Sequence, residues 1–229
     1  RLAASMLYKT DTALGVLPLG TLNHFAKDLE IPAPIEEAVT ALLSGRIEHI
    51  DIGSVNGHIF VNNACLGIYP EAVKMRTRIM ANLGFSKYVA MTLALFSSFR
   101  RLPSYELMLM EKGVAGRIRS PFLFVGNNLY TPDLFATVKR ESLTDGLFSL
   151  FYADRTTRLE LFGLAVRTLF GVLREAPKME MRTVKEIRIA SRKRVIEAAL
   201  DGEVLRLAPP LIFQLLPRTL KVILPGNLS

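Results

Sequence analysis

Three short stretches of the chain carry residue types that could bind phosphate, hold a metal ion or move a proton. The first is Gly20-Thr21-Leu22-Asn23, between an apolar run and residues with helical spacing. Thr21 stands where a helix N-cap would, and the free N–H groups of a helix N-terminus favour an anion such as phosphate. An ordinary capped helix is the simpler interpretation of the tetrapeptide alone, and no Walker A sequence follows.

The other two stretches each contain an Asp-Gly pair. In "ALDGEV", Asp201 and Glu203 would share one face of an extended strand, with Gly202 leaving room for a ligand between them. In "LTDGLF", Asp145 and nearby carbonyl groups could hold a hard divalent ion such as Mg²⁺. Asp-Gly between apolar runs is also common in hairpin turns, and a turn is the simpler interpretation of each pair taken singly.

The composition limits the classes of partner and site. Lys and Arg exceed Asp and Glu by 29 − 21 = +8, which favours partners that carry phosphate. The single cysteine, Cys65, excludes an intramolecular disulfide and suits a reducing cytosol. The three histidines lack HExxH spacing, so no zinc site is predicted. Nucleic acid is not predicted as a partner, because no recognition motif and no Trp accompany the charge.

No segment is predicted to cross a membrane. The longest apolar stretch, residues 88–99, has twelve residues and includes polar ones, whereas a span needs ~20. Residues 155–175 have an apolar stripe and several arginines, so they could lie on a membrane surface. A helix that faces the core with solvated arginines is the simpler interpretation of that segment.

Residues 1–47 have an α/β pattern. A short buried strand is predicted at Leu14–Leu17, followed by a helix that the Pro-rich residues 31–34 end. A second helix is predicted from Ile35 to about Leu43. With one evident strand, this piece is too small to stand alone, so we expect it to be the tail of a larger α/β domain that begins before Arg1.

The pattern changes near residue 48 to alternating apolar and polar residues, first around the hairpin signal Asn56-Gly57. Two helices, at about Ser86–Phe99 and Arg158–Leu173, interrupt the strands that follow. Those strands are predicted at Tyr105–Glu111, Ile118–Val125, Leu147–Tyr152, Lys185–Ile189, Val195–Leu200, Val204–Leu207 and Leu211–Leu216. The sequence therefore predicts an α/β piece followed by a mostly antiparallel β-rich domain.

The order of the motifs resembles the diacylglycerol kinase catalytic-domain family, which includes bacterial soluble lipid kinases and the sphingosine and ceramide kinases. "LGVLPLGTLNHFAKDLEIP" resembles its strand-loop-helix motif, G-T-x-N-D-F-A-R-x-L-x-I-P. "VNNACLGI", "LTDGLFSLF", "ALDGE" and "LPRTLKVILP" resemble its later motifs in the expected order. The resemblance covers nearly the whole chain.

This resemblance implies an ATP- and Mg²⁺-dependent lipid kinase with its active site between two domains. Residues 1–47 would be the C-terminal part of an α/β nucleotide-binding domain. Residues 48–229 would form a mostly antiparallel, β-sandwich-like lipid-substrate domain with two helices. The family's G-G-D-G-T nucleotide loop would fall before Arg1, so we expect the chain as given to be inactive by itself.

The resemblance also assigns roles to residues by position. Asp201 matches the catalytic base and Glu203 its acidic neighbour. The residues matching the nucleotide loop are Gly20, Thr21 and Asn23, with Thr21 touching the nucleotide. Those matching a structural Mg²⁺ site are Ser142, Asp145 and Leu147, the aspartate through its carboxylate and the other two through their carbonyl groups.

One position departs from the family motif: His24 stands where an Asp is usual. A neutral imidazole is a poor Mg²⁺ ligand, which leaves the metal arrangement and the substrate in doubt. The alternatives are a non-catalytic lipid- or nucleotide-binding relative and a soluble-substrate kinase of the NAD kinase type. For a kinase, we expect a cytoplasmic protein that docks peripherally on a membrane. The lipid and the oligomeric state, a homodimer included, are not identified.

Overall fold

The structure is a computed structural model. It describes residues 1–20, 23–67, 70, 73, 105–111, 114–130, 140, 142–153 and 179–226. Thr21 lies outside the described residues, as do the two helices expected at about 86–99 and 158–173 and the amphipathic segment 155–175. Within the described part of the chain, no helix is long and apolar enough to cross a bilayer.

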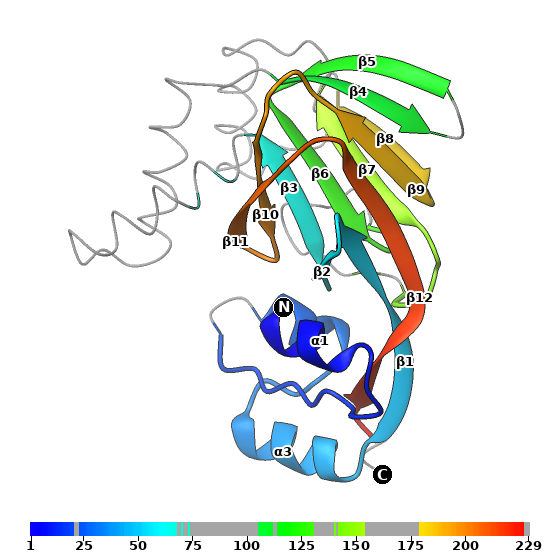
Figure 1. The fold of residues 1–229 in the computed structure, drawn as a ribbon. Coiled ribbons are helices and arrows are strands. Elements are labelled where there is room, and N and C mark those ends of the chain that lie inside the picture. The colour runs from blue at the N-terminus through cyan, green and yellow to red at the C-terminus, as the bar shows by residue number, and fades with distance from the viewer. Residues whose placement is uncertain are drawn as a thin grey trace, which may run out of the picture.

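Two six-stranded sheets pack face to face (Figure 1). The first has the order β2-β1-β12-β9-β4-β5 and the second β11-β10-β3-β6-β7-β8. The first sheet contains β1 (Arg46–Val55), β2 (His58–Phe60), β4 (Tyr105–Glu111), β5 (Val114–Ser120), β9 (Glu186–Ala190) and β12 (Leu211–Leu224). The second contains β3 (Asn63–Gly67), β6 (Phe122–Asn127), β7 (Phe148–Ala153), β8 (Met179–Val184), β10 (Ile196–Leu200) and β11 (Glu203–Leu207). These strands pair antiparallel, which confirms the predicted β-sandwich-like architecture.

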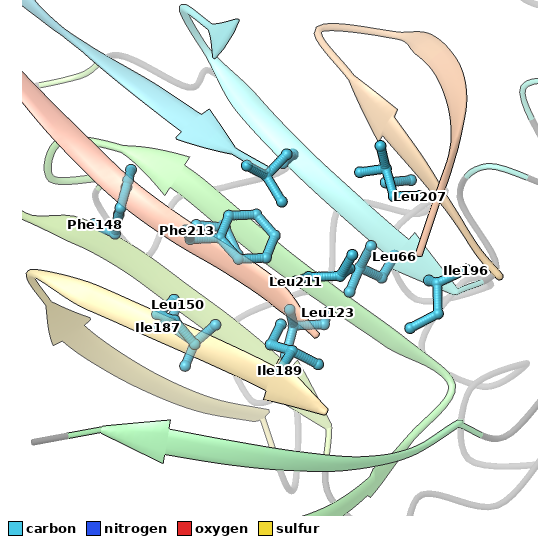
Figure 2. Packing of buried hydrophobic residues seen from close by; sticks show 14 of the residues in the cluster. Leu66, Leu123, Phe148, Leu150, Ile187, Ile189, Ile196, Leu207, Leu211 and Phe213 are labelled. Atoms are coloured by element: carbon cyan, nitrogen blue, oxygen red, sulfur yellow. The ribbon is translucent and has the colours of Figure 1, made fainter. Parts of the chain in front are cut away.

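Apolar side chains from the two inner faces interdigitate to form the main core (Figure 2). Alternate residues of a strand point to opposite faces, so Ile187 and Ile189 of β9 are buried while Glu186 and Arg188 are exposed. At one end of the core, the ring of Phe60 from the first sheet stacks at 6.0 Å on that of Phe148 from the second. Phe213 of β12 meets Phe60 edge-on at 6.3 Å.

The N-terminal residues pack against an extension of β1 and β12 beyond the sandwich (Figure 1). They form α1 (Leu2–Leu7), α2 (His24–Asp28) and α3 (Ile35–Leu43). A second apolar cluster joins Leu29 and Ala38 of this region to Ile52 and Val222 of the two long strands. Because β1 runs through residue 48, the same strand serves both regions, and the domain boundary expected there stays a prediction.

Several local expectations agree with the structure. The predicted second helix coincides with α3, and the helix after the Gly20 loop is present as the shorter α2. Asn56 and Gly57 both have positive φ, 49° and 82°, as a tight two-residue hairpin turn requires. Asp201 and Gly202 have the same conformation, with φ of 48° and 84°, so this Asp-Gly pair is a hairpin turn between β10 and β11.

Other expectations are wrong. Leu14–Leu17 is not a buried strand, because only Leu14 forms a bridge, to Val222, and Leu17 is 40% exposed. The single strand predicted at Ile118–Val125 is the end of β5 and most of β6, separated at Pro121, which has no N–H to donate to a sheet. The sequence analysis also missed α1 and β8.

The last strand is longer than predicted. The predicted Leu211–Leu216 is only the first part of β12, which continues past Pro217 to Leu224. The pairing of β1 with β12 shifts its register between Ile50 and Ile52. Arg218 lies opposite this shift in β12, and its φ of 49° makes the strand irregular there.

An added methyl group should lower the free energy of unfolding by different amounts at two glycines with positive φ. At Gly57, a Cβ would meet no atom within 4 Å. Gly57→Ala should therefore lower the free energy of unfolding only by the strain of a left-handed backbone, about 1 kcal/mol. At Gly67, with a φ of 94°, the Cβ would lie 2.1 Å from the Pro121 carbonyl oxygen. We expect Gly67→Ala to lower the free energy of unfolding by roughly 2–5 kcal/mol. Equal melting temperatures of the two variants would contradict this packing.

Candidate active site

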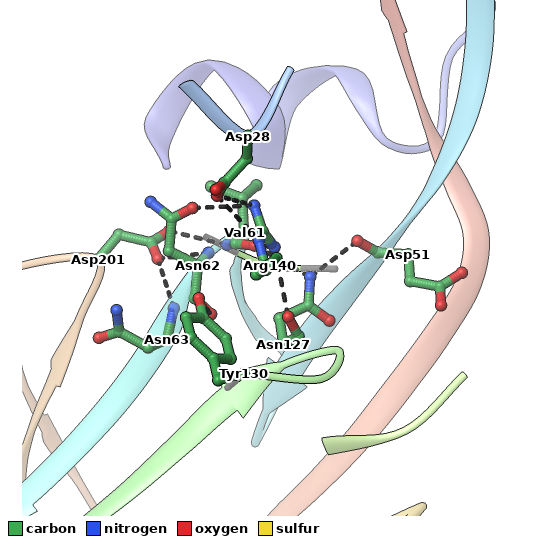
Figure 3. Close-up of polar contacts among 9 residues, drawn as sticks. All are labelled: Asp28, Asp51, Val61, Asn62, Asn63, Asn127, Tyr130, Arg140 and Asp201. Carbon is green, nitrogen blue, oxygen red and sulfur yellow. Dashed lines mark hydrogen bonds and ion pairs between the residues drawn. The ribbon is translucent and has the colours of Figure 1, made fainter. Parts of the chain in front are cut away.

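The Asp201 carboxylate lies against three consecutive backbone N–H groups (Figure 3). Val61 donates to Oδ2 at 2.8 Å, and Asn62 and Asn63 donate to Oδ1 at 2.8 and 3.1 Å. These residues link β2 to the start of β3, while Asp201 occupies the tip of the β10–β11 hairpin. Successive N–H groups that converge in this way form an anion-binding nest, here filled by a side chain of the same protein.

Opposing effects act on the charge of this carboxylate. Burial raises the pKa of the Asp201 carboxyl above its ordinary value, because a partly dry environment disfavours the charged form. The hydrogen bonds from the three N–H groups partly offset this rise, because they stabilise the charged form. The result is a half-buried carboxyl group that holds its proton more tightly than an exposed aspartate does.

The carbonyl groups of the same segment, Val61–Asn63, are also satisfied. The Val61 carbonyl accepts from Arg140 Nη1 at 2.7 Å and from Asn127 Nδ2 at 2.9 Å. The Asn62 carbonyl accepts from the Asn127 N–H at 2.8 Å and from the Tyr130 hydroxyl at 3.0 Å. The Asn63 carbonyl accepts from the Asp201 N–H at 2.9 Å. Every backbone polar group of the segment therefore has a partner, which fixes the nest that holds Asp201.

Arg140 connects this segment to α2. Its Nε and Nη2 lie 2.9 and 2.8 Å from Asp28 Oδ2, and its guanidinium carbon lies 5.9 Å from the centre of the Phe25 ring. Nη2 also donates to Asn62 Oδ1 at 3.1 Å, and Nη1 to the Asn127 carbonyl at 3.3 Å. With the Val61 bond, the guanidinium donates four hydrogen bonds, and each of its three nitrogens donates at least one. The Arg140 and Asp28 side chains are 0% and 6% exposed, so this is a buried ion pair.

The Gly20 loop precedes α2. Asn23 closes it, because Oδ1 accepts from the Gly20 N–H at 2.7 Å and Nδ2 donates to the Pro18 carbonyl at 2.9 Å. The structure thus brings Gly20 and Asn23 together. The N-cap prediction for Thr21 is wrong, because α2 begins at His24 and its N-cap residue is Asn23, in the left-handed conformation. Because α2 has only five residues, the side-chain bonds of Asn23, and not a long helix, define the structure of this loop.

The predicted metal residues lie in a loop, not a hairpin turn, since β6 ends at Asn127 and β7 begins at Phe148. Asp145 Oδ2 accepts from the Leu129 N–H at 3.2 Å, and the Leu147 carbonyl accepts from the Asn128 N–H at 3.0 Å. Ser142 Oγ accepts from the Thr144 N–H at 3.0 Å. The predicted ligands thus comprise one carboxylate with backbone oxygens, which are the hard donors that Mg²⁺ takes. No cluster of three or more His, Cys, Asp or Glu side chains suited to a metal occurs among the described residues.

Asp51 holds this loop to β1. Its N–H donates to the Leu143 carbonyl at 2.9 Å, and its carboxylate accepts from the Gly146 N–H at 2.8 Å. The other carboxylate oxygen accepts from the Arg218 N–H at 2.8 Å, at the register shift between β1 and β12. Asp51 is 1% exposed, so a buried carboxylate fixes both the loop and the irregular part of the long strands.

Glu203 does not share a strand face with Asp201, because Asp201 is a turn residue and only Glu203 belongs to β11. The Glu203 carboxylate forms an ion pair with Arg1, and its side chain is 51% exposed. The two carboxylates of the Asp-Gly-Glu sequence therefore have different surroundings and partners.

The buried thiol of Cys65 has a pKa raised by burial, so it is not a nucleophile at neutral pH.

The sequence analysis missed the residues that support Asp201: Asp28, Asn127, Tyr130 and Arg140. Asp28 and Arg140 look like solvated charges, because nothing local indicates that they pair across the chain. One signal was available: an Asn-Asn pair follows an apolar segment twice, at residues 62–63 and 127–128. Asparagines at such positions are typical of side chains that satisfy buried backbone groups.

Two family models match this chain. Residues 65–224 match the YegS C-terminal NAD kinase beta sandwich-like domain, and residues 1–55 match the diacylglycerol kinase catalytic domain. Because the first of these matches covers most of the chain, the chain belongs to the family with the YegS C-terminal NAD kinase beta sandwich-like domain, and its N-terminal residues match the diacylglycerol kinase catalytic domain. The family assignment made from the motifs is thereby confirmed.

The chain is also similar to individual proteins, and the solved structures among them share its fold. A diacylglycerol kinase of Staphylococcus aureus (strain bovine RF122 / ET3-1) is 25% identical over 192 residues, which cover 83% of this chain and 59% of that protein. A crystal structure of a diacylglycerol kinase from Bacillus anthracis str. Sterne has a TM-score of 0.64 at 18% identity, over 98% of this chain and 71% of that one. A second structure, of a diacylglycerol kinase candidate from the same organism, has a TM-score of 0.71 at 19% identity, over 99% and 74%. The chain thus spans less than two thirds of the length of its curated relative.

Asn127 should be among the most sensitive positions of this site. Its Nδ2 donates to the carbonyl groups of Asp51 and Val61, at 2.8 and 2.9 Å, and the residue is fully buried. Asn127→Asp keeps the shape but places a carboxylate oxygen against two carbonyl oxygens. We expect a loss of about 3–5 kcal/mol in the free energy of unfolding, measured by denaturant titration. A loss below about 1 kcal/mol would contradict the assignment of these hydrogen bonds.

Proposed function

We propose that the chain forms part of an ATP- and Mg²⁺-dependent lipid kinase, which transfers the γ-phosphate to a hydroxyl group of a diacylglycerol-like lipid. The family membership and the names of the relatives support a kinase of this type. Residues 1–47 belong to the nucleotide-binding domain, and residues 48–229 form the lipid-substrate domain. The protein reaches its lipid by docking on the cytoplasmic surface of a membrane, where basic side chains add ~1 kcal/mol each near anionic lipids.

The fixed position of the Asp201 carboxylate carries the proposal. An ionised carboxylate offers about four acceptor sites, and the N–H groups of the segment Val61–Asn63 occupy three of them. The remaining site accepts the proton of the lipid hydroxyl as its oxygen attacks the γ-phosphorus. A general base held in this way contributes ~10²–10⁴-fold to the rate. Glu203, at the start of β11, adds negative charge nearby.

The other site residues serve the nucleotide and the metal. Gly20, Thr21 and Asn23 form the loop that binds the nucleotide, and the bonds of the Asn23 side chain fix that loop. Ser142, Asp145 and Leu147 would hold a structural Mg²⁺, through one carboxylate and two carbonyl groups, and the ion would fix the loop before β7. ATP would supply the phosphoryl group, with its negative charge neutralised by metal.

One observation favours a second candidate, a non-catalytic lipid- or nucleotide-binding relative. His24 is the first residue of α2, at the place where the family motif has an Asp. An imidazole at this place cannot give a nucleotide-bound Mg²⁺ the carboxylate that an aspartate would. A soluble acceptor of the NAD kinase type is favoured only by the similarity of residues 65–224 to an NAD kinase beta sandwich-like domain.

The decisive experiment uses the full-length protein that contains this chain. It is incubated with γ-labelled ATP, Mg²⁺ and vesicles that contain diacylglycerol, and the label is followed into the organic phase. We expect transfer by the unmutated protein and none by Asp201→Asn, with both proteins folded by circular dichroism. Glu186→Gln, the same chemical change at an exposed position of β9, is the matched control and should transfer label normally.

Two results would contradict the proposal. Label transfer by Asp201→Asn at more than about a tenth of the unmutated rate would remove Asp201 from the role of base. No transfer to any lipid by a folded full-length protein that binds ATP would favour the non-catalytic relative. Label transferred to NAD instead would favour the soluble-substrate kinase.

The metal assignment predicts a difference in thermal stability. If Mg²⁺ binds at the loop before β7, it stabilises the folded protein by mass action, and millimolar Mg²⁺ should raise the melting temperature. Asp145→Asn removes the one carboxylate of the proposed ligand set, so this variant should gain much less. The control variant Glu186→Gln should show the same rise in melting temperature as the unmutated protein. An equal rise in Asp145→Asn would mean that Mg²⁺ binds elsewhere.

A further inference from the structure

We propose that Arg140 is a positioning residue that couples α2 and its nucleotide loop to the catalytic carboxylate of Asp201. This inference rests on the proposed function, because it assigns Arg140 a task in the same reaction. It goes beyond the function because, among the described residues, the polar contacts of Arg140 are with Asp28, Val61, Asn62 and Asn127 and not with Asp201, Gly20 or Asn23. Its effect passes through the segment Val61–Asn63 on one side and through Asp28 on the other (Figure 3).

The first half of the argument is the geometry around the segment. The N–H groups of Val61 and Asn62 donate to Asp201, while the Val61 carbonyl and the Asn62 side chain accept from Arg140, at 2.7 and 3.1 Å. A peptide group is planar and rigid, so a carbonyl that is held in place also fixes the direction of the next N–H. Movement of the guanidinium therefore tilts the Asn62 N–H, which donates to the carboxylate at 2.8 Å.

The second half is the contact with α2. Asp28 accepts a hydrogen bond from Nε of Arg140 and forms an ion pair with Nη2, and the Phe25 ring lies 5.9 Å from the guanidinium carbon. α2 starts directly after Asn23, whose side chain closes the Gly20 loop. One planar group thus joins the helix behind the nucleotide loop to the segment behind the base. A one-ångström misplacement of reacting groups can cost on the order of 10²-fold in rate, so the junction affects the alignment of the phosphate with the hydroxyl.

The chemistry requires arginine. The guanidinium satisfies five acceptor contacts from one plane, whereas a lysine ammonium has three N–H donors and no fixed plane. Arg140→Lys therefore keeps the positive charge but cannot hold Asp28, Val61 and Asn62 together. We expect kcat to fall by about tenfold or more in Arg140→Lys, with the KM for ATP changed less than kcat. Arg46→Lys, the same change at an exposed arginine whose side chain is 60% exposed, is the matched control.

A second variant separates positioning from stability. Arg140→Met alone would leave the Asp28 carboxylate buried without a partner and could fail to fold. The double variant Arg140→Met/Asp28→Leu removes both charges and keeps a similar volume, a replacement that is often neutral or stabilising. We expect this double variant to melt within a few degrees of the unmutated protein but to have a kcat reduced by on the order of 10²-fold.

Hydrogen exchange provides a readout that does not depend on activity. Amide protons of the segment Val61–Asn63 are held by Asp201, and their exchange should accelerate by about tenfold in both Arg140 variants if the guanidinium fixes the segment. Full-length protein with Mg²⁺ and ATP is compared with each variant and with Arg46→Lys. Faster exchange together with a lower kcat at an unchanged melting temperature supports the inference.

The opposing results are distinct. A double variant with unchanged kcat and unchanged amide exchange overturns the inference and leaves the proposed function intact. A variant that only melts earlier, with normal kcat per folded molecule, shows a purely structural ion pair and also overturns it. If the unmutated protein transfers no label, the proposed function fails, and the exchange rates alone still decide whether Arg140 fixes the segment.

Discussion

The three N–H groups of Val61, Asn62 and Asn63 converge on one carboxylate, and much of the site depends on that arrangement. Backbone N–H groups cannot converge unless the segment is held from its other side, because each buried carbonyl also needs a donor. Three side chains supply those donors. Asn127 is the last residue of β6, Tyr130 follows that strand, and Arg140 lies just before the proposed metal loop. The hairpin that carries Asp201 is docked by the same contacts, so the proposed base and its support form one unit.

A second buried carboxylate extends this unit to the long strands. Asp51 fixes the proposed metal loop through Leu143 and Gly146, and its carbonyl accepts from Asn127, which also supports the segment around Asp201. It lies at the register shift where β1 and β12 leave the sandwich and run to the N-terminal helices. The proposed metal loop, the proposed base and the strands that join the two regions are therefore linked through side chains that are buried.

The sequence predicts the parts of the fold that local rules determine. α3 has a proline at its N-cap and an amphipathic pattern, and the turns at Asn56-Gly57 and Asp201-Gly202 need residues that tolerate positive φ. The predicted turn was right for Asp201, and it was the family resemblance, not the local pattern, that favoured a site residue over a simple turn residue. Its role follows from contacts with residues 138 to 140 positions away, which no local pattern contains. Leu14–Leu17 was predicted wrongly because an apolar run does not reveal whether a neighbouring strand is available to pair with it.

The most direct measurement of the central claim is the pH dependence of kcat/KM for the lipid in the full-length protein. The pKa of the Asp201 carboxyl is raised by burial, so the base is lost to protonation as pH falls through that raised value. The account predicts an acid limb whose midpoint lies above the ordinary aspartate value of about 4, present equally in Glu186→Gln. The titration of ATP itself, followed separately, is subtracted from the profile. An activity that stays constant down to pH values near 4 would contradict Asp201 as a buried general base.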